Sequence, residues 1–218
     1  ISMLGWATRQ LRGSGYWPSV SPDGSRIAFQ GQASDPGDLW VMGANGEGAR
    51  RLLHFDRTTD WLGRPVWSPD GERLGYSRGH QAKDSTVLSI ECLDVKSGRR
   101  TILLTDDRQL GGLGHWGVWA PDGRIVYARS DSPLSEGENL WQIKVDARHG
   151  KTSGKPKRIT DWADVPCFPS NISADGKRLL IYKAQGQLDV YVAGFDGTGA
   201  MSEPPRRLTL SDRNDRMV

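Results

Sequence analysis

One short pattern recurs four times along this chain and limits what it can fold into. At residues 68–71 it reads Ser-Pro-Asp-Gly, and related tips follow at residues 21–24, 120–123 and 173–176. Proline presets φ for a turn, the aspartate carboxylate can cap it, and glycine supplies a positive φ, so the pattern predicts the tip of a β-hairpin. We therefore expect positive φ at all four turn glycines, Gly24, Gly71, Gly123 and Gly176.

The spacing of these turns indicates a repeat architecture. The turn aspartates Asp23, Asp70, Asp122 and Asp175 follow one another at intervals of 47, 52 and 53 residues. Each interval also holds a third strand-like run, such as residues 39–42, and a basic fourth run, such as residues 50–53. A period of roughly 40–50 residues made of short strands is typical of a β-propeller blade. The sequence thus predicts an all-β propeller with four full, four-stranded antiparallel blades.

The repeat also suggests boundaries within a single domain that covers residues 1–218. We expect blades at about 16–58, 59–108, 109–163 and 164–210, and the outer half of another blade at residues 1–15. The next hairpin tip would fall beyond the last residue, so the sequence predicts a part of a larger ring. Open blade edges of that kind could also support oligomer formation.

Composition excludes several classes of function. The 29 basic and 26 acidic residues give a net charge of +3, and the paired basic residues fall on the fourth strand of each repeat, where charge protects an exposed edge. Nucleic-acid binding is therefore not expected. No apolar run approaches the roughly 18 residues of a membrane-spanning helix. Cys92 and Cys167 lack the spacing of a zinc site, and we expect Cys92 to be a buried apolar residue.

The chain offers little for catalysis or metal binding. It contains no G-x-S-x-G, H-E-x-x-H or glycine-rich phosphate loop. The histidines His54, His80, His115 and His149 fall singly in four inter-strand segments, and only His80 and His115, with His54 as a further candidate, would share one face of a ring. We expect solvated loop histidines, with no metal and no cofactor.

A binding site is more naturally placed in the long connections between strands. In a blade the hairpin tips share one face with the turns between the third and fourth strands, while the remaining loops share the other face. The tips are nearly identical, whereas the loops diverge, and divergent loops on a rigid scaffold usually carry binding. Their tryptophans and arginines are typical interface anchors. The alternative is that Trp61, Trp116 and Trp162 merely fill the bases of the loops. The predicted binding residues are Trp61, Arg64, Arg78, His115, Trp116, Arg129 and Trp162.

The pattern W-S-P-D-G-x-R, followed by a D-L-W-V-M run and an R-R-L run, resembles the TolB-like (WD-like, PD40-type) β-propeller repeat of bacteria. Similar repeats form the N-terminal propeller of prolyl-oligopeptidase-type serine peptidases. The resemblance implies a ring of about six blades and a periplasmic or other extracytoplasmic location. It favours a non-catalytic scaffold that binds a protein or peptide partner through the loop face. The alternatives are the gating propeller of a serine peptidase whose hydrolase domain is not in this sequence and, third, a metal-dependent propeller lyase.

Overall fold

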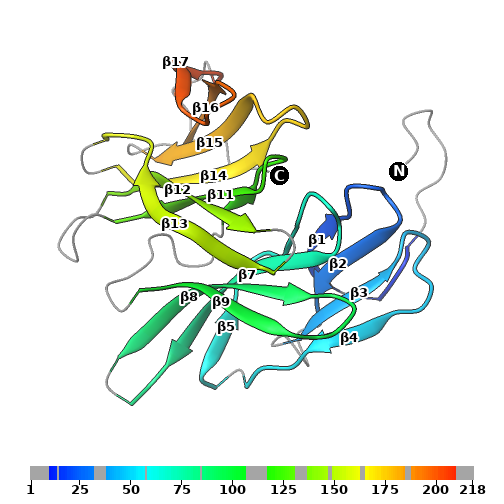
Figure 1. Cartoon of the computed structure of the whole chain (residues 1–218). Helices are drawn as coiled ribbons and strands as arrows, with labels where there is room; N and C mark the ends of the chain where they lie inside the picture. The colour runs from blue at the N-terminus through cyan, green and yellow to red at the C-terminus, as the bar shows by residue number, and fades with distance from the viewer. Residues whose placement is uncertain are drawn as a thin grey trace.

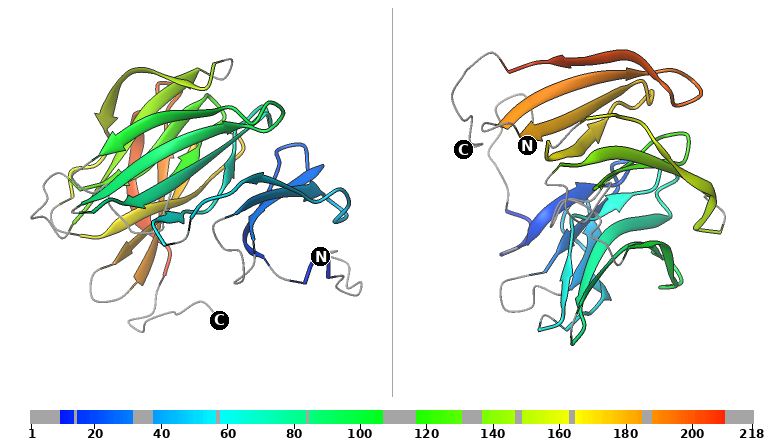
Figure 2. Two further views of the ribbon diagram at one scale, coloured as in Figure 1. Left: turned by 90° about the horizontal axis from the view of Figure 1, so that it is seen from below. Right: turned by 90° about the vertical axis from the view of Figure 1, so that its left-hand side faces the viewer.

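The computed structural model contains four antiparallel sheets that follow one another along the chain (Figure 1). It describes residues 10–13, 15–31, 38–56, 58–83, 85–106, 117–130, 137–146, 149–162, 165–184 and 188–209. The sheets succeed one another in an arc, with each sheet turned relative to the one before it (Figure 2). The predicted all-β architecture of four propeller blades is confirmed.

Each blade is a meander whose strands pair in sequence order. The first strand is innermost and the fourth is outermost. Blade 1 contains β1 (Tyr16–Val20), β2 (Arg26–Gln30), β3 (Leu39–Gly43) and β4 (Arg50–Leu53). Blade 2 contains β5 (Asp60–Leu62), β6 (Val66–Trp67), β7 (Arg73–Gln81), β8 (Thr86–Asp94) and β9 (Arg100–Asp106). Blade 3 contains β10 (Val118–Trp119), β11 (Arg124–Arg129), β12 (Asn139–Asp146) and β13 (Lys151–Arg158). Blade 4 contains β14 (Cys167–Ile172), β15 (Arg178–Ala184), β16 (Leu188–Phe195) and β17 (Met201–Arg207).

The inner strand of blade 2 and the outermost strands of blades 3 and 4 differ from the sequence prediction. The inner strand of blade 2 is split into β5 and β6, which both pair with β7, and Pro65 lies in the break, where it has no amide to donate to a ladder. In blades 3 and 4 the outermost strand begins at Lys151 and Met201, several residues before the basic runs at residues 157–160 and 206–209 that the sequence indicates. These strands include Pro156 and Pro204, which an outermost strand tolerates because one of its edges is unpaired.

The hydrophobic core lies between successive blades. Trp67 and Trp119, at equivalent inner-strand positions, are almost fully buried against the preceding blade. Trp141 packs half-buried against the core between blades 2 and 3, whereas Trp40, at the corresponding place in blade 1, lies half-buried beneath the guanidinium of Arg12. Burial of large aromatic side chains supplies much of the favourable free energy of such packing. The blades are therefore held together mainly by contacts between sheets.

The hairpin tips are built by side-chain hydrogen bonds as well as by backbone geometry. In blade 2, Ser68 Oγ accepts a hydrogen bond from the amide of Arg73 at 2.9 Å and donates to Asp70 Oδ1 at 2.5 Å. Blades 1 and 4 repeat both contacts. The predicted positive φ at the turn glycines is confirmed, with values of 74°, 71°, 86° and 70° at Gly24, Gly71, Gly123 and Gly176.

The tip of blade 3 departs from this arrangement because Ala120 replaces the serine. Asp122 instead accepts a hydrogen bond from Arg124 Nε at 2.6 Å. Where the serine is present, its hydrogen bond stabilises the charged carboxylate and holds the pKa of Asp23 and of Asp175 below the usual range.

The arginine that follows each tip reaches the next blade. Arg26 Nη2 donates to the carbonyl of Gly71 at 2.7 Å, and its guanidinium lies 4.8 Å from the ring centre of Trp67. Arg73 lies against Gly150 of blade 3, and Arg124 lies against Gly199 of blade 4, so closely that a side chain at Gly199 would collide with it. One repeated residue therefore joins each blade to its successor.

The sequence also made predictions about a half-blade at the N-terminal end, about the cysteines and about membrane-spanning helices. The half-blade expected at residues 1–15 lies mostly outside the described residues, and residues 10–13 form no strand. Cys92 and Cys167 are unpaired and buried, as expected for Cys92. Among the described residues, no helix has the length and apolar character needed to cross a bilayer.

Candidate functional site

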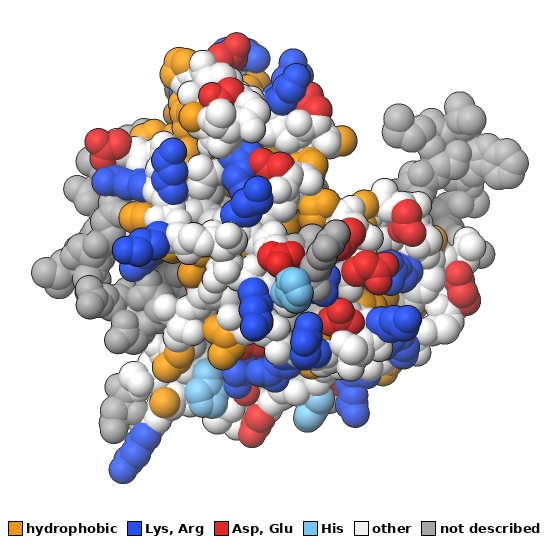
Figure 3. All heavy atoms as spheres, viewed as in Figure 1, with side chains coloured by type: hydrophobic (Ala, Val, Ile, Leu, Met, Phe, Trp, Pro, Cys, Tyr) orange, Lys and Arg blue, Asp and Glu red, His pale blue; other side chains and the backbone are white. Residues whose placement is uncertain are grey.

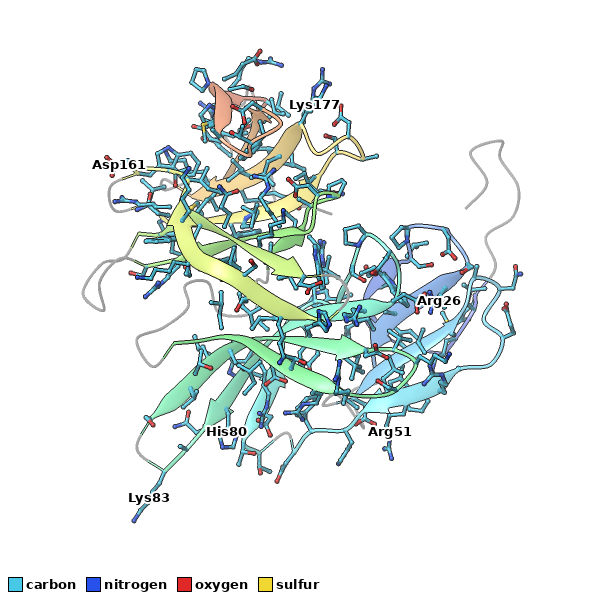
Figure 4. The ribbon with its side chains drawn as sticks, viewed as in Figure 1. Arg26, Arg51, His80, Lys83, Asp161 and Lys177 are labelled. Atoms are coloured by element: carbon cyan, nitrogen blue, oxygen red, sulfur yellow. The ribbon has the colours of Figure 1, made fainter. Side chains whose placement is uncertain are left out.

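The meander topology places two kinds of connection at opposite ends of every blade. The hairpin tips and the turns between third and fourth strands form one end, here called the turn end. The remaining connections form the other, here called the loop end. In Figure 4 the loop-end residues His80, Lys83 and Asp161 lie on the left, and the turn-end residues Arg26 and Lys177 lie on the right.

Two of the predicted binding residues, Trp61 and Arg78, belong to the inner strands of blade 2. Trp61, on β5, lies across its partner Gly79 on β7, so closely that a Cβ at Gly79 would overlap the indole ring. Beside it, Arg78 donates to Asp60 Oδ1 through Nε at 2.9 Å and approaches the same atom through Nη2 at 2.7 Å. Both side chains are thus held by their own blade, which agrees with a packing role for Trp61.

Arg78 also belongs to a buried ionic network. Glu91, whose side chain is 1 % exposed, accepts hydrogen bonds from Tyr76 Oη at 2.8 Å and Ser89 Oγ at 3.1 Å. Arg78 and Arg100 approach its carboxylate to 3.6 and 3.4 Å. Burial, together with the nearby Glu91 charge, raises the pKa of Tyr76, so this phenol remains a hydrogen-bond donor. Sequence reasoning missed the network because its members come from three strands and look like ordinary surface charges.

The remaining predicted residues belong to blades 2 and 3. Trp162 packs beside the core of blades 3 and 4, its amide donates to Asn139 Oδ1 at 2.7 Å, and Lys183 lies 4.8 Å from its ring centre. Arg129 lies over Trp141 at 5.3 Å. Arg64 is exposed and donates through Nη2 to the carbonyl of Ser170 at 3.0 Å. His115 and Trp116 lie outside the described residues.

Two loop-end histidines are oriented by buried aspartates. His80 Nδ1 lies 2.9 Å from Asp60, whose side chain is 7 % exposed. His54 Nδ1 lies 2.6 Å from Asp38, whose side chain is fully buried. In both pairs the histidine side chain is exposed to solvent, as expected, but its ring is held by the aspartate. His80 lies within β7 and not in an inter-strand segment, where the sequence placed it. In the described part of the chain, no group of three histidine, cysteine, aspartate or glutamate side chains is arranged to hold a metal ion.

A buried polar residue clamps the loop end of three blades, and sequence reasoning overlooked it. It precedes the aromatic residue of the third strand by two positions and binds the fourth strand or the segment that follows it. Asp38 contacts Arg51 at 3.1 Å in addition to His54, and Asp189 accepts a hydrogen bond from Thr209 at 2.8 Å. Asn139 accepts from Thr160 at 3.0 Å as well as from Trp162. The signal was present in the sequence as D-L-W, N-L-W and D-V-Y.

A second overlooked feature joins the loop ends of blades 3 and 4. Glu138 is 8 % exposed, and its amide donates to the carbonyl of Val165 at 3.0 Å. Its carboxylate accepts from the amide of Cys167 at 3.3 Å, and its carbonyl accepts from the thiol of the same residue at 3.3 Å. Burial raises the pKa of Glu138 to about 7, because the charged form has lost most of its hydration.

The turn end also carries a hollow, which lies between the tips of blades 2 and 3. Its lining includes Asp70, Asp122, Asp146 and Lys144. Over the face shown in Figure 3, acidic and basic side chains are mixed rather than gathered into one continuous stripe. Any test of a loop-end site therefore needs a matched control at the turn end.

No family model matches the chain. Over 32 residues it is 62 % identical to the Tol-Pal system protein TolB of Anaeromyxobacter dehalogenans (strain 2CP-C), which covers 15 % of this chain and 7 % of that protein. Its fold is similar to a crystal structure of TolB from Acinetobacter baumannii, with a TM-score of 0.61 and 21 % identity over 86 % of this chain and 42 % of that one.

The fold of this chain is about as similar to two enzyme structures as it is to TolB. An oligogalacturonate lyase in complex with manganese gives a TM-score of 0.62 and 16 % identity over 92 % of this chain and 55 % of that one. A prolyl endopeptidase gives 0.60 and 20 % identity over 86 % of this chain and 29 % of that one. This chain therefore spans little more than half of these relatives at most, and the structural likeness is one of fold.

Proposed function

We propose that this TolB-like β-propeller is a non-catalytic scaffold that binds a protein or peptide partner through its loop end. The observation that carries the proposal is the contrast between the two ends of the blades. The turn end repeats the same serine and aspartate hydrogen bonds in blades 1, 2 and 4. The loop end places different side chains on a shared buried clamp, which is how a repeat scaffold presents a specific surface.

The proposal also accounts for the buried polar contacts at the loop end. Asp60 and Asn139 hold strand ends together there through hydrogen bonds and an ion pair. A preorganised surface loses less conformational entropy on binding, and so binds a partner more tightly. We also propose, on the strength of the repeat resemblance, that the protein works outside the cytoplasm.

The experiment uses exposed residues, because Trp61, Arg78 and Trp162 support the fold and their variants would confuse folding with binding. Lys83 lies in the loop between β7 and β8, at the loop end of blade 2 (Figure 4). Lys96 lies in the turn between β8 and β9, at the opposite end of the same blade, and both lysines are exposed. A photo-cross-linking amino acid is placed at each position in the cells that produce the protein. We expect one recurrent partner at position 83 and none shared with position 96.

Charge reversal of the same two lysines then measures the interaction with the purified partner by calorimetry. Lys83→Glu should weaken binding by about tenfold if this lysine borders the contact, whereas Lys96→Glu should leave it unchanged. Cross-links only at position 96, or equal effects of the two reversals, would show that the loop end is not the binding face.

A further inference from the structure

One position recurs in each repeat, and in the described blades it belongs to the innermost strand. It lies six residues before the turn aspartate and holds Trp17, Arg64, Trp116 and Pro169 in the four repeats. Trp17 is in β1, Arg64 lies in the break between β5 and β6, and Pro169 is in β14, all on the innermost strands. Trp116 lies outside the described residues. Because this position comes four residues before the first residue of the tip, it lies on the loop-end side of the tip.

Arg64 shows that this position can reach across the arc. Its Nη2 donates to the carbonyl of Ser170, which is 106 residues further along the chain and directly follows Pro169. The side chain thus passes from the inner strand of blade 2 to the inner strand of blade 4. Its partner is a neutral carbonyl, and no carboxylate among the described residues contacts the guanidinium. An arginine offers five N–H donors in a planar fork, so most of its capacity for a carboxylate remains unused.

Trp17 supplies an exposed aromatic ring on the inner strand of the neighbouring blade 1. Its relative exposure is 44 %, and its φ of 49° is the only positive value at a non-glycine residue among those described. Such a conformation is unfavourable for a bulky residue and is often retained at binding sites. Trp67 Nε1 donates to the carbonyl of Ser19 at 2.9 Å, which fixes β6 beside β1. Trp17 and Arg64, a few residues before this contact, therefore start from neighbouring inner strands.

We infer that Trp17 and Arg64 form a binding site for a carboxylate-bearing peptide segment. The inference rests on the proposed function, because it names the chemistry that the partner would bring to the loop end. The carboxylate binds the free edge of the Arg64 guanidinium, and a neighbouring apolar side chain, such as proline, packs on the Trp17 indole. A peptide fits better than a nucleic acid, because the site offers one uncompensated cation rather than the row of cations that a phosphate backbone requires.

The test uses a fluorescently labelled peptide of alternating glutamate and proline with blocked ends, and a matched peptide in which glutamine replaces glutamate. Binding is followed by fluorescence anisotropy at low and high salt. We expect the glutamate peptide to bind at least about tenfold more tightly than the glutamine peptide, and salt to weaken it, since the contact is between opposite charges. Arg64→Gln should remove most of the difference between the two peptides.

Trp17→Asn removes the ring while keeping a residue that tolerates positive φ, so the fold is preserved. This variant should lose about tenfold or more in affinity for the glutamate peptide, as expected for an aromatic anchor. Lys96→Gln at the turn end is the control and should bind as the parent does. Thermal melts that match the parent establish that each variant is folded.

Absence of binding to the glutamate peptide, or binding that both Arg64→Gln and Trp17→Asn leave unchanged, overturns the inference. Failure here and failure of the proposed function are distinguishable. If a partner still cross-links at position 83 while the peptide does not bind, the loop-end scaffold stands and the Trp17–Arg64 site does not. If the peptide binds through both residues while position 83 captures no partner, the site stands without the wider loop-end interface.

Discussion

Replacing Glu138 by glutamine should stabilise the protein at neutral and alkaline pH. The side chain is almost fully buried, and the contact to its carboxylate is a hydrogen bond from the amide of Cys167 at 3.3 Å. Glutamine has nearly the same shape and can accept the same hydrogen bond, so the substitution removes the charge and little else. The variant therefore isolates the free energy of holding a carboxylate at this place.

The magnitude follows from the pKa. Burial raises the pKa of Glu138 from 4.5 to about 7, and at about 1.4 kcal/mol per pKa unit this corresponds to about 3 kcal/mol. The folded state binds the proton more tightly than the unfolded state. Between pH 4.5 and about 7 it therefore carries more protons, and the free energy of unfolding falls as the pH rises through this window. Above about pH 7 the loss is complete, and the parent is destabilised by the full amount.

The assay is urea unfolding of Glu138→Gln and the parent across this range, with Glu72→Gln, at an exposed tip residue, as the control. We expect the glutamine variant to exceed the parent in free energy of unfolding by up to about 3 kcal/mol near pH 8, with the difference shrinking toward zero near pH 4.5. A difference between Glu138→Gln and the parent that does not change with pH would refute the reasoning, since it would show that charge burial is not its cause.

Three further predictions concern the scaffold. Gly71→Val should cost about 1–3 kcal/mol, because a β-branched residue is strained at a φ of 71°, and a thermal melt equal to the parent's would contradict this turn geometry. Gly79→Ala should displace the Trp61 ring, which near-ultraviolet circular dichroism would detect, and an unchanged spectrum would show that the ring is not held there. Glu91→Ala should destabilise the protein by about 3–5 kcal/mol, because Tyr76 loses its buried hydrogen-bond acceptor and Arg78 and Arg100 lose a buried carboxylate, and a urea midpoint within error of the parent's would argue against the ionic network.

The local parts of the fold were predictable from the sequence because their causes are local. A glycine that must adopt positive φ, a proline that presets a turn and a serine that can bond the following strand all act within six residues, and they give the tips and the number of blades. The starts of β13 and β17 were not predictable in this way. An outermost strand pairs along one edge only, so it tolerates lysine, glycine and proline, and its composition resembles that of a loop.

For the candidate site, the sequence predicted only which types of residue lie at the loop end. The sequence indicated that arginine and tryptophan gather at the loop end, but it could not show that Trp61 packs on Gly79 or that Arg64 reaches Ser170, because those contacts depend on how strands and blades face one another. Trp17 could have been found by counting back from each turn aspartate, a comparison that places it with Arg64 and Trp116. Its exposure and its backbone conformation required the structure.

The arginine after each tip has a consequence for how the protein loses its structure. Because Arg26, Arg73 and Arg124 each contact the blade that follows, the coupling that these arginines supply runs between nearest neighbours along the array. The free energy of unfolding of such an array is approximately the sum of the stability of each blade and the stability of each interface between blades, as in a one-dimensional chain of coupled units. Local unfolding can then begin at a weakened interface between two blades and stop at the next intact interface. A substitution at one of these arginines should therefore weaken one interface and leave the other two arginine contacts intact.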